Sequence, residues 1–261
     1  RWGGLRWVDM LAGDILSLAG GGKIIRRHVG KIAACVRPRT RGGAVIGVER
    51  GFALEEPDET ITYLDELWTG DDLRMNEGGC DPDGRFYCGS MAYDQQPGAG
   101  ALYRLDVDGS VRAVLENVTV SNGIEWSPDG SRVYYNDTAT HHISVFDYDL
   151  KRGLTGGRVF VDLSAEGKRP DGLTVDAEAG VWVALSNGAA VRRYTPEGVL
   201  DAVIEVPVRK VTACAFGGAR LDCLFITTSR EGIAPGDDLL AGSLFRAFVG
   251  VRGIPVREFA G

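Results

Sequence analysis

The sequence contains few of the residues that build the commonest catalytic and metal sites. It has only three His and five Cys in 261 residues, and neither a C-x-x-C nor an H-E-x-x-H motif occurs. These absences argue against a zinc site made of thiolates or imidazoles alone. The G-x-S-x-G motif is also missing, which argues against a serine hydrolase with a nucleophile elbow.

Basic clusters and long apolar runs are absent as well. The net charge is −7, and the densest basic stretch is the short "IIRRHVGK", so we expect no nucleic-acid partner. No run of about 18 apolar residues occurs, so we expect no membrane-spanning helix. The five cysteines are irregularly spaced and odd in number. We therefore expect reduced thiols, buried as small apolar side chains, in a cytoplasmic protein.

Turn signals are abundant and separate short apolar runs. "DPDG" at 81–84, "SPDG" at 127–130, "DAEAG" at 176–180 and "TPEG" at 195–198 each stand between runs rich in Val, Ile, Tyr, Phe and Trp. This pattern is typical of β-hairpins. Long amphipathic helical periodicity is not found. The sequence therefore predicts an all-β chain.

The hairpins repeat along the chain in one common form. A polar residue leads a short apolar strand, which is followed by a turn and a second apolar strand, at intervals of roughly 40–50 residues. The clearest copies are "RMNEGGCDPDGRFYCGSM", "VSNGIEWSPDGSRVYYND", "RPDGLTVDAEAGVWVALSN" and "KVTACAFGGARLDCLFITTS". With two looser copies before them, the repeats predict a six-bladed β-propeller with a central metal-binding channel.

We expect residues 1–261 to form one propeller domain. Because the chain begins at Arg1 with no initiator Met, we also expect N-terminal residues of the first blade to be missing from it.

The leading polar residues of the four clear copies are Asn76, Asn122, Asp171 and Thr212. In a propeller, equivalent positions of the innermost strands converge on the axis. Asn-Gly and Asp-Gly are ordinary turn dipeptides, but here the turns lie at the other ends of the strands. One carboxylate and two amide oxygens suit a hard divalent cation. We therefore interpret Asn76, Asn122 and Asp171 as candidate metal ligands, with Gly123 allowing the backbone to turn beneath Asn122.

These motifs, together with "VFDYDL" and "NGAAVRRYTPEG", closely resemble the senescence marker protein/gluconolactonase family, which includes regucalcin. The resemblance covers essentially the whole chain. It implies a six-bladed propeller that binds one divalent cation in its channel and hydrolyses sugar lactones. The similar diisopropyl fluorophosphatase hydrolyses organophosphates in such a channel.

By motif, the resemblance implies roles for five residues. Asn122 and Asp171 match two metal ligands of the family, and Asp171 also matches its proposed general base. Arg74 and Asn76, in R-x-N-x-G, match substrate contacts, and Asn76 is in addition a candidate metal ligand. Asp94 matches an acidic substrate contact.

The sequence departs from the family at one metal ligand, the Glu of an E-G-P-x-W motif in the first blade. Trp2 matches the Trp of that motif and Arg1 its variable residue, so the Glu would lie three positions before Arg1, outside this sequence. Glu49 and Glu77 are alternative carboxylates, although we expect both to be solvated surface charges.

We thus predict a metal-dependent lactonase that acts on a small-molecule sugar lactone, as a monomer or weak oligomer. Ca²⁺ is the expected cofactor, with Mn²⁺, Zn²⁺ and Mg²⁺ as alternatives. Two rival hypotheses stay open: a metal-dependent organophosphate hydrolase, and a non-catalytic calcium-binding propeller.

Overall fold

The computed structural model describes residues 4–234 and 236–261. In these residues the regular structure is almost entirely β, with short 3₁₀ turns η1 (Met10–Ala12), η2 (Gly20–Gly22), η3 (Thr138–Thr140) and η4 (Ser164–Glu166). No helix in this part of the chain is long and apolar enough to cross a membrane.

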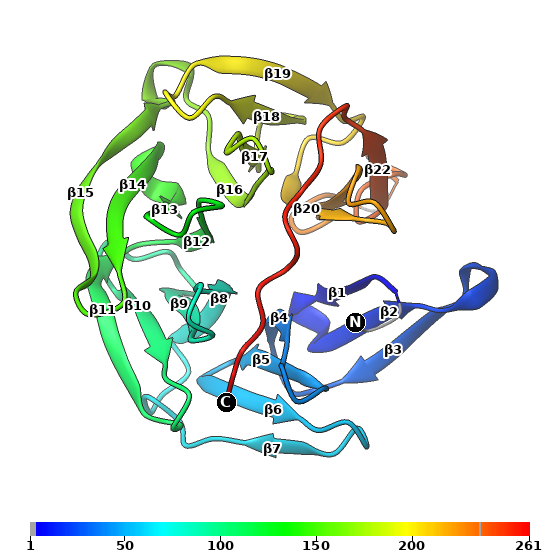
Figure 1. The fold of residues 1–261 in the computed structure, drawn as a ribbon. Coiled ribbons are helices and arrows are strands. Elements are labelled where there is room, and N and C mark those ends of the chain that lie inside the picture. Colours follow the sequence, from blue (N-terminus) through cyan, green and yellow to red (C-terminus); the bar gives the residue numbers. More distant parts are fainter. Residues whose placement is uncertain (1–3, 235) are drawn as a thin grey trace. The chain divides into compact units, whose positions relative to one another are not determined.

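The chain forms two compact units, of which the first comprises the residues up to Ser121 together with Val256–Gly261. It contains three antiparallel sheets, labelled in Figure 1. The first has β1 (Arg6–Asp9), β2 (Asp14–Leu18) and β3 (Ile24–His28); the second has β4 (Ala33–Pro38), β5 (Ala44–Val48), β6 (Gly51–Glu55) and β7 (Ile61–Tyr63); the third has β8 (Leu73–Cys80), β9 (Phe86–Ala92), β10 (Gly100–Leu105) and β11 (Val111–Val118).

The second unit comprises Asn122–Pro255. Its three sheets are also antiparallel, and each is built from consecutive strands. The strands are β12 (Ser121–Trp126), β13 (Arg132–Asp137), β14 (His142–Asp149) and β15 (Gly153–Asp162); then β16 (Pro170–Val175), β17 (Val181–Leu185), β18 (Ala190–Tyr194) and β19 (Leu200–Glu205); then β20 (Val211–Gly217), β21 (Cys223–Thr228) and β22 (Leu244–Phe248).

Within the described residues, six consecutive meander sheets of three or four strands are the blades of a six-bladed β-propeller. The predicted all-β, six-bladed propeller is confirmed, and its central metal-binding channel stays a prediction. The organisation of residues 1–261 as a single domain stays a prediction.

Four turns that join neighbouring strands of a sheet follow one design. In "DPDG", "SPDG" and "TPEG" the fourth residue has a left-handed backbone, with φ of 78° at Gly84, 72° at Gly130 and 85° at Gly198. In "DAEAG" the corresponding residue is Ala179, with φ of 64°. A Cβ makes this conformation unfavourable by about 1 kcal/mol, so the third repeat uses a strained version of the same turn.

Ala179→Gly should therefore stabilise the protein by about 0.5 kcal/mol, because relief of the strain exceeds the entropy that Gly adds to the unfolded chain. The measurement is the urea midpoint of unfolding. Ala177→Gly in the same turn is the control, since Ala177 has no positive φ, and this variant should lose stability. A loss of stability in Ala179→Gly as well would contradict the strain argument.

Strand β17 shows how the sequence builds the core of the second unit. Val181, Val183 and Leu185 pack with Tyr134 and other residues of the preceding sheet. The alternate residues, Trp182 and Ala184, pack with residues of the following sheet. Successive side chains of a strand point to opposite faces, so a strand covered on both faces is apolar at every position.

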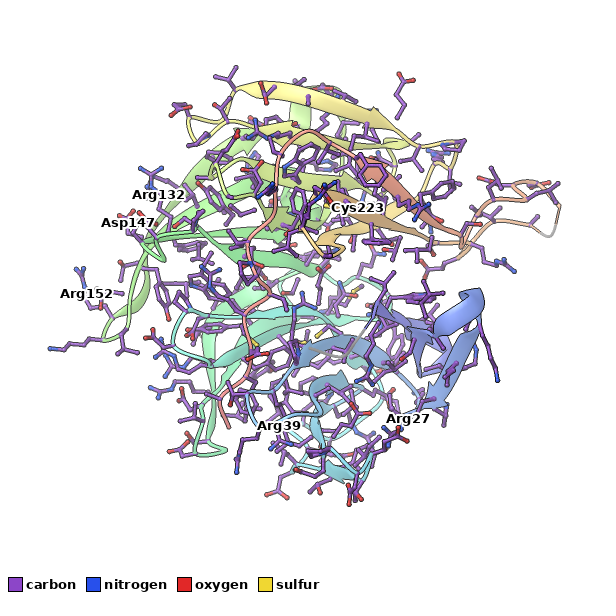
Figure 2. The ribbon with its side chains drawn as sticks, turned by 45° about the vertical axis from the view of Figure 1, so that its right-hand side comes forward. Arg27, Arg39, Arg132, Asp147, Arg152 and Cys223 are labelled. Atoms are coloured by element: carbon purple, nitrogen blue, oxygen red, sulfur yellow. The ribbon has the colours of Figure 1, made fainter. Side chains whose placement is uncertain are left out.

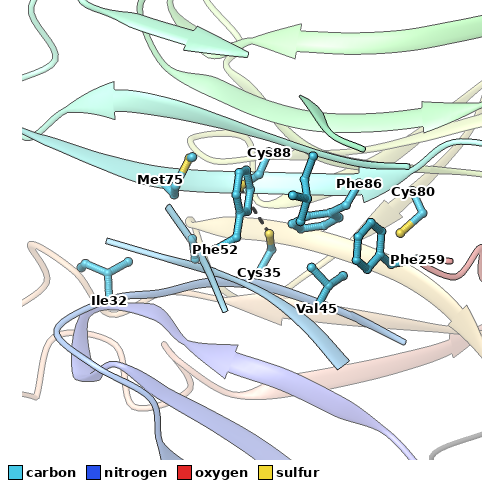
Figure 3. Packing of buried hydrophobic residues seen from close by; sticks show 11 residues of the cluster. Ile32, Cys35, Val45, Phe52, Met75, Cys80, Phe86, Cys88 and Phe259 are labelled. Atoms are coloured by element: carbon cyan, nitrogen blue, oxygen red, sulfur yellow. Dashed lines mark hydrogen bonds between the residues drawn. The ribbon is translucent and has the colours of Figure 1, made fainter. Parts of the chain in front are cut away.

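Cysteines contribute to the core in the way the sequence predicted, since all five side chains are buried and none forms a disulfide. Cys35 and Cys88 lie with their Sγ atoms 3.5 Å apart in a cluster that includes Phe52 and Phe86 (Figure 3). Burial raises the pKa of the Cys88 thiol well above its ordinary value, whereas the hydrogen bond with Cys88 lowers the pKa of Cys35.

Charged side chains lie on several strands and turns of the β12–β15 sheet. In the β12–β15 sheet, Arg132 pairs in register with Asp147, and Arg152 projects from the turn after β14 (Figure 2). Asp147 forms a 3.0 Å ion pair with Arg158, and about half of each side chain or more is exposed. Such exposed pairs stabilise a fold little, so the core and the turns carry the fold.

Candidate functional site

The polar lead residues occupy equivalent places in the sheets of the second unit. Asn122, Asp171 and Thr212 are each the second residue of the first strand of their sheet, on β12, β16 and β20 respectively. Strands β16 and β20 pack directly against each other. The repeat found in the sequence therefore corresponds to a structural repeat of first strands.

The glycines that follow two lead residues allow these first strands to approach closely. A Cβ on Gly123 would lie 2.5 Å from the Leu173 nitrogen and 2.8 Å from the Asp171 carbonyl oxygen. A Cβ on Gly172 would lie 2.9 Å from the Thr212 carbonyl oxygen. Gly123 does not have a positive φ, so our expectation that it serves a backbone turn is wrong. It brings the strand that carries Asn122 against the strand that carries Asp171.

The amide of Asn122 is buried and only half satisfied. Asn122 is 5% exposed, and its Nδ2 donates a 3.0 Å hydrogen bond to Oγ1 of Thr138. The Oδ1 atom is buried and has no hydrogen-bond partner in the described residues. A buried acceptor without a partner is costly, unless a ligand that is not part of the chain satisfies it.

Asp171 is partly buried, and its backbone is held from the preceding sheet. The Asp171 carbonyl oxygen accepts a 2.6 Å hydrogen bond from Nδ2 of Asn136, and the Pro170 carbonyl oxygen accepts a 2.7 Å bond from Oγ1 of Thr138. These two bonds fix the backbone on both sides of the Asp171 α-carbon. No motif in the sequence singled out Asn136 or Thr138.

In the first unit, Arg74 and Asn76 are neighbours on β8 and both are buried. Nη1 of Arg74 donates a 2.7 Å hydrogen bond to Oδ1 of Asn76, and Nδ2 of Asn76 donates a 2.6 Å bond to the Ser121 carbonyl oxygen. Both ends of the Asn76 amide are therefore engaged, in contrast to Asn122. This arrangement suits an orienting role better than direct metal ligation, for which Oδ1 would have to use its second lone pair.

Asp94 is exposed, and its Oδ1 accepts a 3.0 Å hydrogen bond from the Gln96 amide in a turn. Its neighbour Tyr93, which sequence reasoning missed, lies against Arg74: the guanidinium carbon is 5.8 Å from the ring centroid. The Tyr93 hydroxyl donates a 2.7 Å bond to Glu49. The prediction that Asp94 contacts substrate stays untested.

Glu49 and Glu77 are not the solvated surface charges that we expected. Glu49 is 13% exposed in its side chain and forms a 2.5 Å ion pair with Lys31. Glu77 is partly buried, and this burial raises its pKa to about 7, although the nearby Arg37 opposes the shift. The sequence could not show this, because the residues around Glu77 come from a different sheet.

The raised pKa of Glu77 predicts a pH-dependent stability. A folded pKa of about 7 against an ordinary 4.5 means that the native state binds more protons than the unfolded chain between these values. Stability should therefore fall as the pH rises from 4.5 to 7, by about 2–3 kcal/mol. Glu77→Gln should remove this loss and be more stable than the wild type at pH 8.

Urea unfolding at pH 4.5, 6, 7 and 8 measures the effect of Glu77→Gln. The control is Glu116→Gln, because Glu116 is exposed. An unchanged pH profile in Glu77→Gln would show that Glu77 titrates normally.

The donors fit a hard cation better than a soft one. Among residues 4–234 and 236–261, no group of three or more His, Cys, Asp or Glu is arranged to hold a metal ion. A site built on the Asn122 amide oxygen and the Asp171 carboxylate has only one charged ligand, and oxygen ligands of this kind suit Ca²⁺, Mg²⁺ or Mn²⁺. Arg1 and Trp2, which match the end of the first-blade motif, lie outside the described residues.

A cavity of about 370 Å³ in the first unit is a weaker candidate. Arg6, Arg26 and Arg27 line it together with Glu55 and Glu59. The three guanidinium groups already form ion pairs, since Arg6 and Arg27 both bind Glu55 and Arg26 binds Asp14. We assign it no role.

Comparison with known proteins agrees with this architecture. Residues 1–230 match the model of the SMP-30/Gluconolactonase/LRE-like region. Regucalcin of Danio rerio is 35% identical over 240 residues, which cover 88% of this chain and 81% of that protein. The crystal structure of regucalcin from Agrobacterium tumefaciens, described as a calcium-binding protein, has a TM-score of 0.92 and 25% identity, covering 98% of this chain and 89% of that one. A luciferin-regenerating enzyme has a TM-score of 0.85 and 26% identity, covering 97% and 90%.

The fold and the candidate site thus define the class of protein. It is a six-bladed propeller in which the first strands of several blades carry a polar residue near their start. The chain belongs to the SMP-30/gluconolactonase/LRE-like family.

Proposed function

We propose that this protein is a divalent-cation-dependent hydrolase of sugar lactones. The observation that carries the proposal is the buried Oδ1 of Asn122, which has no partner in the described residues and lies on the strand packed against Asp171. Membership of a family that includes gluconolactonases supports the choice of reaction. Calcium is the expected cation, because a relative of known structure is described as calcium-binding.

Asn122 and Asp171 would hold the cation, and Asn76 is a further candidate ligand. When bound, the cation would polarise the lactone carbonyl and stabilise negative charge on its oxygen. Arg74 would donate hydrogen bonds to oxygens of the substrate, since a guanidinium does not act as an acid. Asn76 and Asp94 stay predicted substrate contacts.

Asp171 would act as the general base of the hydrolysis. Its carboxylate accepts a proton from a water molecule as the water oxygen forms a bond to the lactone carbonyl carbon. The bond between that carbon and the ring oxygen then breaks, and the proton passes from Asp171 to the ring oxygen. The product is the open hydroxy acid, which ionises near neutral pH and releases acid to the solution.

The test is a pH-stat assay on δ-gluconolactone after chelator treatment, with Ca²⁺, Mn²⁺, Zn²⁺, Mg²⁺ or no metal added back. Turnover that returns with a cation supports the proposal. No turnover with any metal on several sugar lactones would refute it. The same assay on a phosphotriester tests the organophosphate hydrolase hypothesis.

Replacement of Asn122 by Ala should weaken cation binding at least about 10-fold, because a ligand oxygen is lost. The cation-induced rise in melting temperature should shrink accordingly. Asn187→Ala is the control, since the Asn187 amide is fully engaged with Arg169 and Gly167. If both variants retain the wild-type thermal shift with Ca²⁺, Asn122 is not a ligand.

A second candidate function is cation binding without catalysis, which the description of the Agrobacterium relative favours. It predicts tight Ca²⁺ binding and no hydrolysis of any lactone. The location in a reducing cytoplasm, inferred from five thiols outside any disulfide, and the monomeric or weakly oligomeric state also remain proposals.

A further inference from the structure

The hydroxyl of Thr138 occupies a defined place between the two ligand-bearing strands. Thr138 is 3% exposed and begins the 3₁₀ turn η3 directly after β13. Its Oγ1 lies 3.0 Å from Nδ2 of Asn122 on β12 and 2.7 Å from the Pro170 carbonyl oxygen on β16. One side chain therefore contacts the residue before Asp171 and the amide of Asn122.

The direction of these hydrogen bonds follows from the atoms involved. A carbonyl oxygen only accepts, so the single hydroxyl proton of Thr138 is committed to Pro170. Oγ1 can then only accept from Asn122, which requires the NH₂ group of the amide to face Thr138. Rotation of the amide by 180° would place two acceptors against each other. Thr138 thus fixes the orientation of the Asn122 amide, because Nδ2 and not Oδ1 must face the Thr138 hydroxyl.

The turn that carries Thr138 is itself held in place. The Asp137 carboxylate accepts a 3.3 Å hydrogen bond from the Ala139 amide, and Oγ1 of Thr140 donates a 2.8 Å bond to the Asp137 carbonyl oxygen. The turn ends at His141, whose φ is 59°, and Nδ1 of His141 lies 2.7 Å from the Lys168 carbonyl oxygen. The Thr138 hydroxyl is therefore held in a fixed position beside the Asn122 amide.

We propose that Thr138 is a positioning residue that presents the Oδ1 atom of Asn122 to a hard divalent cation. This inference rests on the proposed function, because it needs a cation at Asn122 and Asp171. The buried Oδ1 without a partner in the described residues is the independent observation, since a buried acceptor is costly unless a further group satisfies it. Groups that orient metal ligands typically contribute 10–100-fold to metal affinity.

The experiment is calorimetric titration of the chelator-treated full chain with Ca²⁺ and with Mn²⁺. Thr138→Val removes the hydroxyl and keeps the shape, so its dissociation constants should rise about 10–100-fold. Thr138→Ser keeps the hydroxyl and should stay within about 3-fold of the wild type. Thr155→Val is the matched control, because Thr155 lies on β15 and its hydroxyl donates to the Asp147 carbonyl oxygen, away from Thr138, Asn122 and Asp171; its affinity should be unchanged.

A second readout needs no metal. The side-chain NH₂ signals of Asn122, assigned by their loss in Asn122→Ala, should shift and broaden in Thr138→Val and remain as in the wild type in Thr138→Ser. This measurement separates a change in amide orientation from a general loss of structure.

Each outcome decides the proposal. Wild-type affinity in Thr138→Val would overturn the positioning role and leave the cation site standing. Equal losses in Thr138→Val and Thr138→Ser would assign the effect to packing and overturn it as well. A wild-type protein that binds neither cation would refute the proposed function and this inference with it. Weakening in Thr138→Val with rescue in Thr138→Ser would support it.

Discussion

Asp171→Asn is expected to lower kcat/KM for δ-gluconolactone by about 10³-fold, because an amide cannot accept the proton that the attacking water loses. The amide keeps one oxygen in the ligand position, so cation affinity should fall much less than activity. The pH-stat assay measures the first quantity and calorimetric titration with Ca²⁺ the second. Rates should be compared at saturating cation, so that lost metal does not imitate lost base.

Asp149→Asn is the matched control, since Asp149 caps an exposed turn by accepting from the Lys151 amide. It should have wild-type kinetics. Near-normal turnover in Asp171→Asn would exclude Asp171 as the base while leaving it as a possible ligand.

Asp176→Ala should have the largest effect on stability, a loss of about 3–5 kcal/mol in the free energy of unfolding. Asp176 is 0% exposed, and its carboxylate accepts hydrogen bonds from the Gly180 amide at 2.8 Å, the Trp182 indole at 2.8 Å and the Arg193 Nε at 2.7 Å. Alanine leaves these donors buried without an acceptor.

Urea unfolding measures the loss in Asp176→Ala. The control is Glu178→Ala, because Glu178 also pairs with Arg193 but its side chain is 66% exposed; this change should cost less than about 1 kcal/mol. If the two variants lose equal stability, the buried network at Asp176 has little importance for the fold.

The repeated turns were sufficient to predict the six blades, because each turn depends on residues that are neighbours in the sequence. Each "DPDG"-like segment needs an acceptor side chain at its first position and a left-handed residue at its fourth. Asp81 illustrates the first requirement: its Oδ1 accepts from the Asp83 and Arg85 amides, both at 2.9 Å. The hydrogen bonds that form the turn join residues within five positions of the chain, so the sequence alone reveals the turn.

The candidate site was predicted only in part. The repeat placed Asn122 and Asp171 at equivalent positions, and the structure agrees. It could not distinguish Asn122 from Asn76, although the first has a buried oxygen without a partner in the described residues and the second has both ends engaged. The difference depends on the hydrogen bonds of Arg74 with Asn76 and of Thr138 with Asn122, which form only in the folded chain.

The sequence by itself thus determined the all-β class, the number of blades and the equivalent lead positions of Asn122, Asp171 and Thr212, because period and turn chemistry act over a few neighbouring residues. The tertiary structure alone decided the orientation of the Asn122 amide, the raised pKa of Glu77 and the need for Gly123. Each of these depends on atoms from another sheet: the Pro170 carbonyl reached through Thr138, the surroundings that desolvate Glu77, and the Leu173 backbone at 2.5 Å from the Cβ position of Gly123. Such contacts exist only after the strands have packed.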